Sequence, residues 1–164
     1  TVAHIPKGNA TGGTMAPTPI LRTAGANLAL GTDNMHADMV EVMRWALAIA
    51  RLQIGHVSDD WQPHHVFTMA TLAGAEAMGL ADQIGSLRAG KKADLVAFNF
   101  QRPHLTPCVN PLGNLVHTGQ GRDVALVVVN GQVVVQAGEA TQVDETEIRT
   151  EAAKAAQQLW QRCS

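Results

Sequence analysis

The stretch Ala26-Asn-Leu-Ala-Leu-Gly-Thr-Asp33 decides the expected fold of this chain. Residues 26–32 form an apolar run that predicts a buried strand. Gly31 lets the backbone turn sharply and approach a ligand closely. Asp33 then lies at the carboxyl end of the strand, where α/β folds place their chemistry. Because Asp is also an ordinary turn residue after a strand, the neighbouring segments must decide between the two interpretations.

The segments around this strand alternate between strand and helix patterns. Residues 1–5 predict an apolar strand that breaks at Pro6, and residues 15–24 predict a short helix. Asp38 can cap a helix, and a further helix begins at Pro63 and ends at Gly79. The apolar stripes are Met39, Val42, Met43, Ala46, Leu47 and Ala50 in the first of these helices, and Val66, Phe67, Ala70, Gly74, Ala75 and Met78 in the second. This alternation predicts parallel strands with helices packed outside.

The pattern changes after residue 84. Residues 85–92 are a turn-rich bridge into a strand over 93–98, and residues 99–122 are predicted to be a loop rich in Pro and Gly. Asn130-Gly131 follows a β-branched run and precedes another. Because both central positions of a type I′ turn need positive φ, this dipeptide predicts a hairpin.

A final helix is predicted after Asp144-Glu-Thr-Glu147, which resembles a capping box. Its apolar stripe comprises Ile148, Ala152, Ala155 and Leu159. The chain therefore consists of a βα half, a β half and a covering helix.

Composition limits the classes of protein to consider. With 164 residues and 46% hydrophobic content, the chain can form one domain with a sizeable core and a smaller second one. The formal net charge of −2 makes nucleic acid an unexpected partner. Cys108 and Cys163 lack CxxC spacing and fit a reducing compartment, so we expect a cytoplasmic protein. No apolar stretch of about 18 residues predicts a membrane span. The chain opens inside an apparent strand, which suggests missing upstream sequence.

Several short motifs occur in a fixed order. They are His4-Ile-Pro-Lys-Gly-Asn9, Ala16-Pro17 with Ala24-Gly25, Leu30-Gly-Thr-Asp33, Ala70-Thr-Leu-Ala-Gly-Ala75, Gly85-Ser-Leu-Arg-Ala-Gly-Lys-Lys-Ala-Asp-Leu-Val96 and Val129-Asn-Gly-Gln-Val133. In this order they resemble the C-terminal portion of the amidohydrolase superfamily. The nearest likeness is its aminohydrolase branch, which holds guanine deaminases, adenosylhomocysteine and methylthioadenosine deaminases, and triazine hydrolases.

The resemblance implies an α/β fold that is the C-terminal part of a metal-dependent (β/α)8 TIM barrel plus strands of a small β-sandwich and a C-terminal helix. Residues 1–84 would be the last two βα units, residues 85–142 the sandwich strands, and residues 143–164 the helix that packs on the barrel. The N-terminal part of the barrel would lie outside this chain and is an expected partner. Because two parallel strands cannot close a barrel and leave unpaired edges, we expect an ordered form to need that part.

The resemblance also implies a catalytic metal. The family holds it with an H-x-H after the first strand, a His after the fifth and the Asp after the eighth, and Asp33 matches the last position. We expect one divalent metal, zinc or alternatively iron, whose remaining ligands lie outside this chain. Such an ion lowers the pKa of bound water to roughly 7, and Asp33 would act as ligand, general base and then general acid. The expected reaction is hydrolysis of a C–N bond in a small amino-heterocycle such as a purine, pterin, pyrimidine or triazine.

Four residues are candidate substrate contacts: His4, Asn9, Asn34 and His36. The family usually has Gly where Asn34 stands and Ser where Gly8 stands, and both departures concern substrate contacts more than the metal ligand. The remaining histidines, which are His56, His64, His65, His104 and His117, are interpreted as surface, cap or loop residues.

Two other functions stay open at this point. The chain can be a non-catalytic, β-rich binding or oligomerisation module derived from this fold, and a homo-oligomer is possible. It can also belong to another C–N hydrolase of the superfamily, such as an imidazolone hydrolase.

Overall fold

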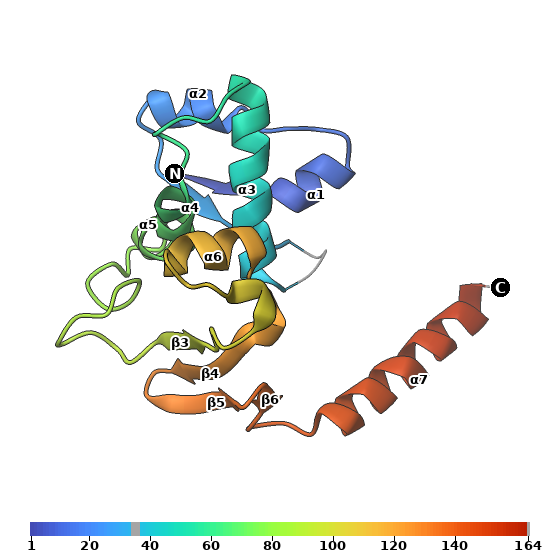
Figure 1. Ribbon diagram of the computed structural model, residues 1–164. Coiled ribbons are helices and arrows are strands. Elements are labelled where there is room, and N and C mark those ends of the chain that lie inside the picture. The colour runs from blue at the N-terminus through green and yellow to red at the C-terminus, as the bar shows by residue number, and fades with distance from the viewer. Residues whose placement is uncertain (34–36, 164) are drawn as a thin grey trace.

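Two short parallel strands carry the stretch quoted first. In the computed structural model, which describes residues 1–33 and 37–163, β1 (Val2–His4) pairs with β2 (Leu28–Leu30) (Figure 1). Val2 lies opposite Leu28 and His4 opposite Leu30. Both strands are shorter than the predicted 1–5 and 26–32. The parallel direction that the βα alternation predicted is confirmed.

Helix α3 (Met39–Ile54) follows β2 and has the predicted boundary and stripe. The Asp38 side chain accepts hydrogen bonds from the backbone N of Val40 and of Glu41, at 2.9 and 3.2 Å. These bonds satisfy amides that a helix N-terminus leaves without intrahelical partners. Five of the six stripe residues, Val42, Met43, Ala46, Leu47 and Ala50, are buried.

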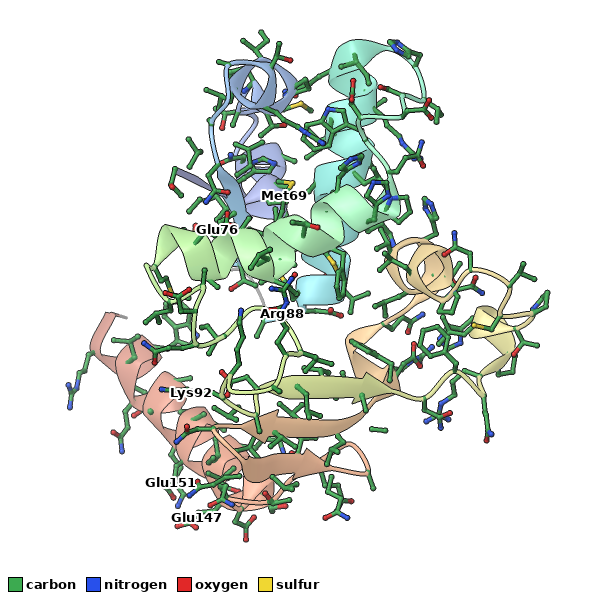
Figure 2. The ribbon with its side chains drawn as sticks, turned by 90° about the vertical axis from the view of Figure 1, so that its left-hand side faces the viewer. Met69, Glu76, Arg88, Lys92, Glu147 and Glu151 are labelled. Carbon is green, nitrogen blue, oxygen red and sulfur yellow. The ribbon has the colours of Figure 1, made fainter. Side chains whose placement is uncertain are left out.

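The single helix predicted from Pro63 to Gly79 is wrong. The chain forms α4 (Pro63–Ala70) and α5 (Leu72–Ala77), separated at Thr71, whose φ and ψ of −126° and −91° are not helical. The Thr71 hydroxyl donates to the Phe67 carbonyl at 2.8 Å, a local bond that often bends helices. Figure 2 labels Met69 on α4 and Glu76 on α5. The break divides the predicted stripe, so that Met78 is exposed.

Two helices that the sequence analysis did not predict begin with proline. The strand over residues 1–5 ends before Pro6, as predicted, but Pro6 then opens α1 (Pro6–Thr11), and Pro111 opens α6 (Pro111–Thr118). Proline is well suited to this position because its missing N–H would have no intrahelical partner. Residues 99–122, predicted as a loop, therefore contain α6 together with the short 3-10 helices η1 (Pro103–Leu105) and η2 (Gly121–Asp123).

The second sheet is antiparallel and has the order β3-β4-β5-β6. Its strands are β3 (Leu95–Phe98), β4 (Val124–Val129), β5 (Gln132–Gln136) and β6 (Glu139–Ala140). The turn between β4 and β5 has φ of 50° at Asn130 and 80° at Gly131, which confirms the predicted hairpin. Figure 2 shows Arg88 in the connection between α5 and this sheet.

One core joins the helices of the first half to α6. Its buried members are Leu28, Val40, Met43, Ala46, Leu47, Ala50, Trp61, Val66, Met69, Leu115 and Val116. Helix α2 (Thr18–Thr23) packs on α3, in agreement with the late-starting helix predicted over 15–24. Since Leu115 and Val116 come from α6, a segment of the predicted sandwich region 85–142 packs against α3 and α4. Together with the mixed sheet and helix content, this makes the chain an α/β fold; its division into domains stays a prediction.

Helix α7 (Glu145–Cys163) extends away from the other elements (Figure 1). Its start is as predicted, because the Asp144 side chain accepts from the backbone N of Thr146 and of Glu147 at 2.8 and 3.1 Å. The apolar stripe of the helix is exposed, with 51% of Ile148 and 58% of Leu159 accessible. Packing of this helix on a barrel stays a prediction.

Candidate functional site

The carboxyl ends of β1 and β2 lie side by side and bring two candidate residues to one edge of the sheet. The Gly31 amide donates to the His4 carbonyl at 2.9 Å, which continues the pairing one residue beyond β2. A Cβ at position 31 would lie 3.3 Å from Cγ2 of Ile5, tighter than most such contacts. Glycine therefore allows the two strand exits to approach each other closely.

Asp33 lies two residues beyond this contact and is exposed. Its φ of 55° places it in the left-handed region, which Asp tolerates better than most residues. Among residues 1–33 and 37–163, no hydrogen bond or ion pair engages its carboxylate. Asp33 thus presents a carboxylate without a partner in the described part of the chain, just beyond the carboxyl edge of the parallel strands; carboxylates serve both as metal ligands and in proton transfer.

His4 is the buried member of this edge. Only 2% of the residue is exposed, and within the described part of the chain neither ring nitrogen has a hydrogen-bond partner. Burial lowers the pKa of His4 below its ordinary value of 6.5, so the imidazole is neutral at pH 7. A neutral ring carries one N–H donor and one lone pair. Because burying such groups without partners costs about 1–3 kcal/mol, His4 is suited to a partner that a ligand or further polypeptide supplies.

The other sequence candidates have different positions. Asn9 is half-buried in α1, which begins two residues after β1; its amide donates to the Ile5 carbonyl and its carbonyl accepts from the Thr14 amide, both at 2.9 Å. Asn9 therefore lies in the segment that follows β1, the strand that ends at His4. Asn34 and His36 lie outside the described residues.

An ion pair that the sequence analysis missed joins the helices on this edge. Lys7 Nζ lies 2.9 Å from Glu41 Oε1, and both side chains are partly buried. Lys7 is in the first turn of α1 and Glu41 in the first turn of α3, so the pair connects the segments that follow the two strands. No local pattern could have indicated it, because the partners are 34 positions apart.

The histidines interpreted as structural include one cap and one buried ion pair. His65 Nδ1 accepts from the Gln62 amide at 3.1 Å, which makes it part of the α4 cap. Burial, with Arg22 and His64 nearby, lowers the pKa of His65. His104 Nε2 lies 2.8 Å from Oδ2 of Asp123, a buried carboxylate that the sequence analysis did not single out.

A complete metal cage is not present in the described ranges. Among residues 1–33 and 37–163, no group of three or more His, Cys, Asp and Glu side chains could hold a metal ion. The Asp33 carboxylate has the right donor chemistry for one zinc ligand. A complete set of ligands would therefore need at least one donor from outside the described residues. Within those residues, no helix has the length and apolar character that crossing a bilayer requires.

Comparisons with known proteins identify relatives of this chain. The profile of the amidohydrolase family matches residues 1–134. A 5-methylthioadenosine/S-adenosylhomocysteine deaminase of Moorella thermoacetica is 40% identical over 162 residues, which cover 93% of this chain and 37% of that protein. The chain thus spans little more than a third of the length of this curated relative.

Two solved structures share the fold. An adenosine deaminase of Xanthomonas campestris with bound zinc superposes with a TM-score of 0.92 at 27% identity, covering 98% of this chain and 37% of that one. The atrazine chlorohydrolase TrzN of Arthrobacter aurescens TC1, as an E241Q mutant complexed with zinc and atraton, gives a TM-score of 0.76 at 26% identity. That match covers 85% of this chain and 32% of the chlorohydrolase.

Proposed function

We propose, from the fact that the chain belongs to the amidohydrolase family, that it is the C-terminal part of a metal-dependent enzyme that hydrolyses a C–N bond of an amino-heterocycle. The observation that carries the proposal is the free, exposed Asp33 carboxylate at the carboxyl edge of β1 and β2. The partner of this chain would be the N-terminal part of the barrel, with the H-x-H and the later histidines. In this proposal the fragment alone is inactive.

Asp33 would act in binding and in proton transfer. When bound, a divalent ion, for which we favour zinc over iron, would supply a water molecule that is acidic enough to react near neutral pH. One oxygen of the Asp33 carboxylate would hold the ion. The other would accept a proton from the attacking water and pass it to the amino nitrogen as the C–N bond breaks. The oxygen stays on the ring carbon as a hydroxyl group, which becomes the carbonyl when its proton moves to the adjacent ring nitrogen, and the amino nitrogen leaves as ammonia.

His4 would bind the heterocycle rather than the ion. Its neutral imidazole offers one donor and one acceptor, both without partners in the described chain. A ring nitrogen or exocyclic group of the substrate would satisfy one of them and thereby orient the ring. We assign supporting contacts to Asn9, Asn34 and His36, all of which follow the two strand exits in sequence.

A purine nucleoside is the substrate class that we favour. The relative from Moorella and the zinc-bound structure from Xanthomonas are both named for deamination of adenosine-type compounds. The low charge of the chain and its two cysteines favour a cytoplasmic enzyme without nucleic-acid or membrane partners, and a homo-oligomer is compatible with this proposal.

The test uses the full-length product of the reading frame that encodes this chain. We expect about one zinc per polypeptide by elemental analysis. Ammonia should be released from adenosine, 5-methylthioadenosine or S-adenosylhomocysteine in preference to guanine or an aminotriazine. Asp33→Asn should lower the turnover rate by about 100-fold or more, since a positioned general base contributes on that scale. Asp59→Asn, an exposed loop aspartate, is the matched control and should leave the rate unchanged.

Two results would contradict the proposal. One is a reading frame that starts near Thr1 and supplies no H-x-H. The other is an Asp33→Asn protein that binds zinc and turns over like the parent. The first result favours the binding-module interpretation.

A further inference from the structure

Ile5 and Gly31 meet where β1 and β2 end. The register that pairs His4 with Leu30 continues to these two residues, and at this level the Gly31 amide donates to the His4 carbonyl at 2.9 Å. Cγ2 of Ile5 lies 3.3 Å from the place where a Cβ of residue 31 would be. The methyl group of Ile5 therefore lies against the side of Gly31 on which other residues carry a side chain.

Ile5 is held from both sides along the chain. β1 ends directly before it at His4, and α1 begins directly after it at Pro6. The Ile5 carbonyl accepts a hydrogen bond from the Asn9 amide at 2.9 Å, which ties it to α1. Because Ile is branched at Cβ, few values of its χ1 angle are favourable, so Cγ2 cannot move far unless the backbone moves as well. Ile5 is therefore a fixed surface against which the exit of β2 packs.

Gly31 is joined to Asp33 through a single residue, Thr32, and the structure describes this whole segment. Asp33 has a left-handed backbone, a conformation that persists in a residue with a side chain only where its surroundings fix it. The distances between a metal ion and its ligand atoms vary by only about 0.2 Å. A Cβ at residue 31 would require a shift of a few tenths of an ångström. A shift of this size at Gly31 is large enough to affect a metal ligand two residues later.

We propose that Ile5 is a positioning residue for Asp33 and that it acts through its contact with Gly31. This inference rests on the proposed function, in which Asp33 binds the metal. Residues that orient a metal ligand without touching the metal typically change metal affinity by about 10–100-fold when they are replaced. We expect an effect of about 10-fold, at the low end of that range, because rotation of the Asp33 side chain compensates in part for a shift of its backbone.

Two substitutions change this contact in opposite directions. Gly31→Ala adds a Cβ that crowds Cγ2 of Ile5, and the backbone at residue 31 accepts Ala because its φ lies outside the left-handed region. Ile5→Ala removes Cγ2 and leaves the exit of β2 without its support. In the double variant, the new Cβ at residue 31 takes up space that Cγ2 has vacated. We therefore expect the double variant to bind the metal better than either single variant.

Two further variants serve for comparison. Ile5→Val is the conservative variant, because Val keeps both branches at Cβ and is shortened only at the far end of the side chain. Gly74→Ala, in α5, is the matched glycine control, since the closest neighbour of its new Cβ outside that helix is the Met69 carbonyl oxygen, at 4.0 Å. Both proteins should bind the metal as the parent does.

The experiment measures cobalt(II) binding to the full-length protein by competition with a chelator, together with the visible absorption of the bound ion and the melting temperature. We expect Gly31→Ala and Ile5→Ala each to weaken cobalt binding by about 10-fold and to change the absorption spectrum. The double variant should bind cobalt to within about 3-fold of the parent, whereas independent effects would multiply to about 100-fold. If one single variant does not fold, the other single variant and its comparison protein carry the test.

The outcomes distinguish the two proposals. Suppose that the parent protein binds cobalt and that Asp33→Ala abolishes the spectrum. If Gly31→Ala and Ile5→Ala then match the parent, or if their effects multiply in the double variant, the positioning role is wrong and the proposed function stands. If the parent protein does not bind cobalt, or if Asp33→Ala leaves the spectrum unchanged, the proposed function itself fails.

Discussion

Replacing His104 by alanine should destabilise the protein by leaving a buried carboxylate without its ion partner. Asp123 is 1% exposed, and its Oδ2 is engaged by His104 and by the Gln120 amide. The other oxygen has no hydrogen bond from any residue in the ranges 1–33 and 37–163, and the half-exposed Arg102 lies 4.0 Å from it. Arg102 therefore contributes little.

The magnitude follows from this geometry. Removing a hydrogen-bond partner of a charged group costs about 1.5–3 kcal/mol. Asp123 is almost fully buried, so water replaces the lost partner poorly. We therefore expect His104→Ala to lower the free energy of unfolding by about 3 kcal/mol, the upper end of that range. His56→Ala, at an exposed histidine, should change it by less than about 0.5 kcal/mol.

A double-mutant cycle tests the reasoning by urea denaturation of the full-length protein. Asp123→Asn keeps the shape of the side chain and removes its charge. In that background His104→Ala should cost no more than about 1 kcal/mol, the value of an ordinary hydrogen bond. The expected coupling between the two sites is thus about 2 kcal/mol, within the range for residues in contact. If the two effects add to within about 0.5 kcal/mol, the pair does not stabilise the fold in the way described.

The same pair has a pH signature. Burial raises the pKa of Asp123. The hydrogen bonds from His104 and Gln120, together with the positive charges of His104 and Arg102, lower it by more than burial raises it. The pKa of Asp123 therefore lies below its ordinary value of 3.8. The native state then binds fewer protons than the unfolded state below that pH. The stabilisation is complete above pH 3.8 and is lost as the pH falls through the native pKa. The stability of the Asp123→Asn protein should lack this dependence on pH.

Three further outcomes are expected. Because burial lowers the pKa of His4, the native state resists protonation, and the stability of the fold should decrease as the pH drops below 6.5. Thermal unfolding of a His4→Phe protein across this pH range should lack this decrease in stability. Leu115→Ala, in the shared core, should cost about 2–5 kcal/mol, whereas Leu52→Ala, at 74% exposure, should cost less than about 0.5 kcal/mol, both by urea denaturation. The isolated 164-residue chain should associate or melt without cooperativity in size-exclusion chromatography and circular dichroism, because no further strand of the described residues pairs with the outer edge of β1 or of β2. A monomer with a cooperative transition would contradict this.

The features that the sequence predicted well depend on interactions between residues that are close together in the sequence. The cap at Asp38 and the stripe of α3 depend on contacts two to four positions apart, and the Asn130-Gly131 turn depends on the backbone preference of two residues. Position along the chain is sufficient for such signals because the interacting groups are neighbours in sequence.

The errors arose where one local signal permits two structures. Proline is a break signal and also a favourable first residue of a helix. At Pro6 the predicted strand end is followed directly by α1, and Pro111 opens α6 within the predicted loop. The break at Thr71 is reinforced from a distance, since Asn27 Nδ2 donates to the Ala73 carbonyl at 3.1 Å. The hydrophobic periodicity of residues 63–79 cannot indicate that bond, because its donor, Asn27, lies outside this range.

The candidate site shows the same division between local and distant information. Asp33 could be found because it follows a strand within an ordered series of motifs, and the parallel pairing then brought it to the same edge as His4. The ion pair between Lys7 and Glu41, which connects the segments after the two strands, joins residues that are 34 positions apart. A sequence pattern can therefore suggest which side chain to test for a role, whereas contacts between distant segments become visible only once the fold brings them together. For that reason a substitution at Lys7 or Glu41 tests the structure itself, while a substitution at Asp33 tests mainly the motif.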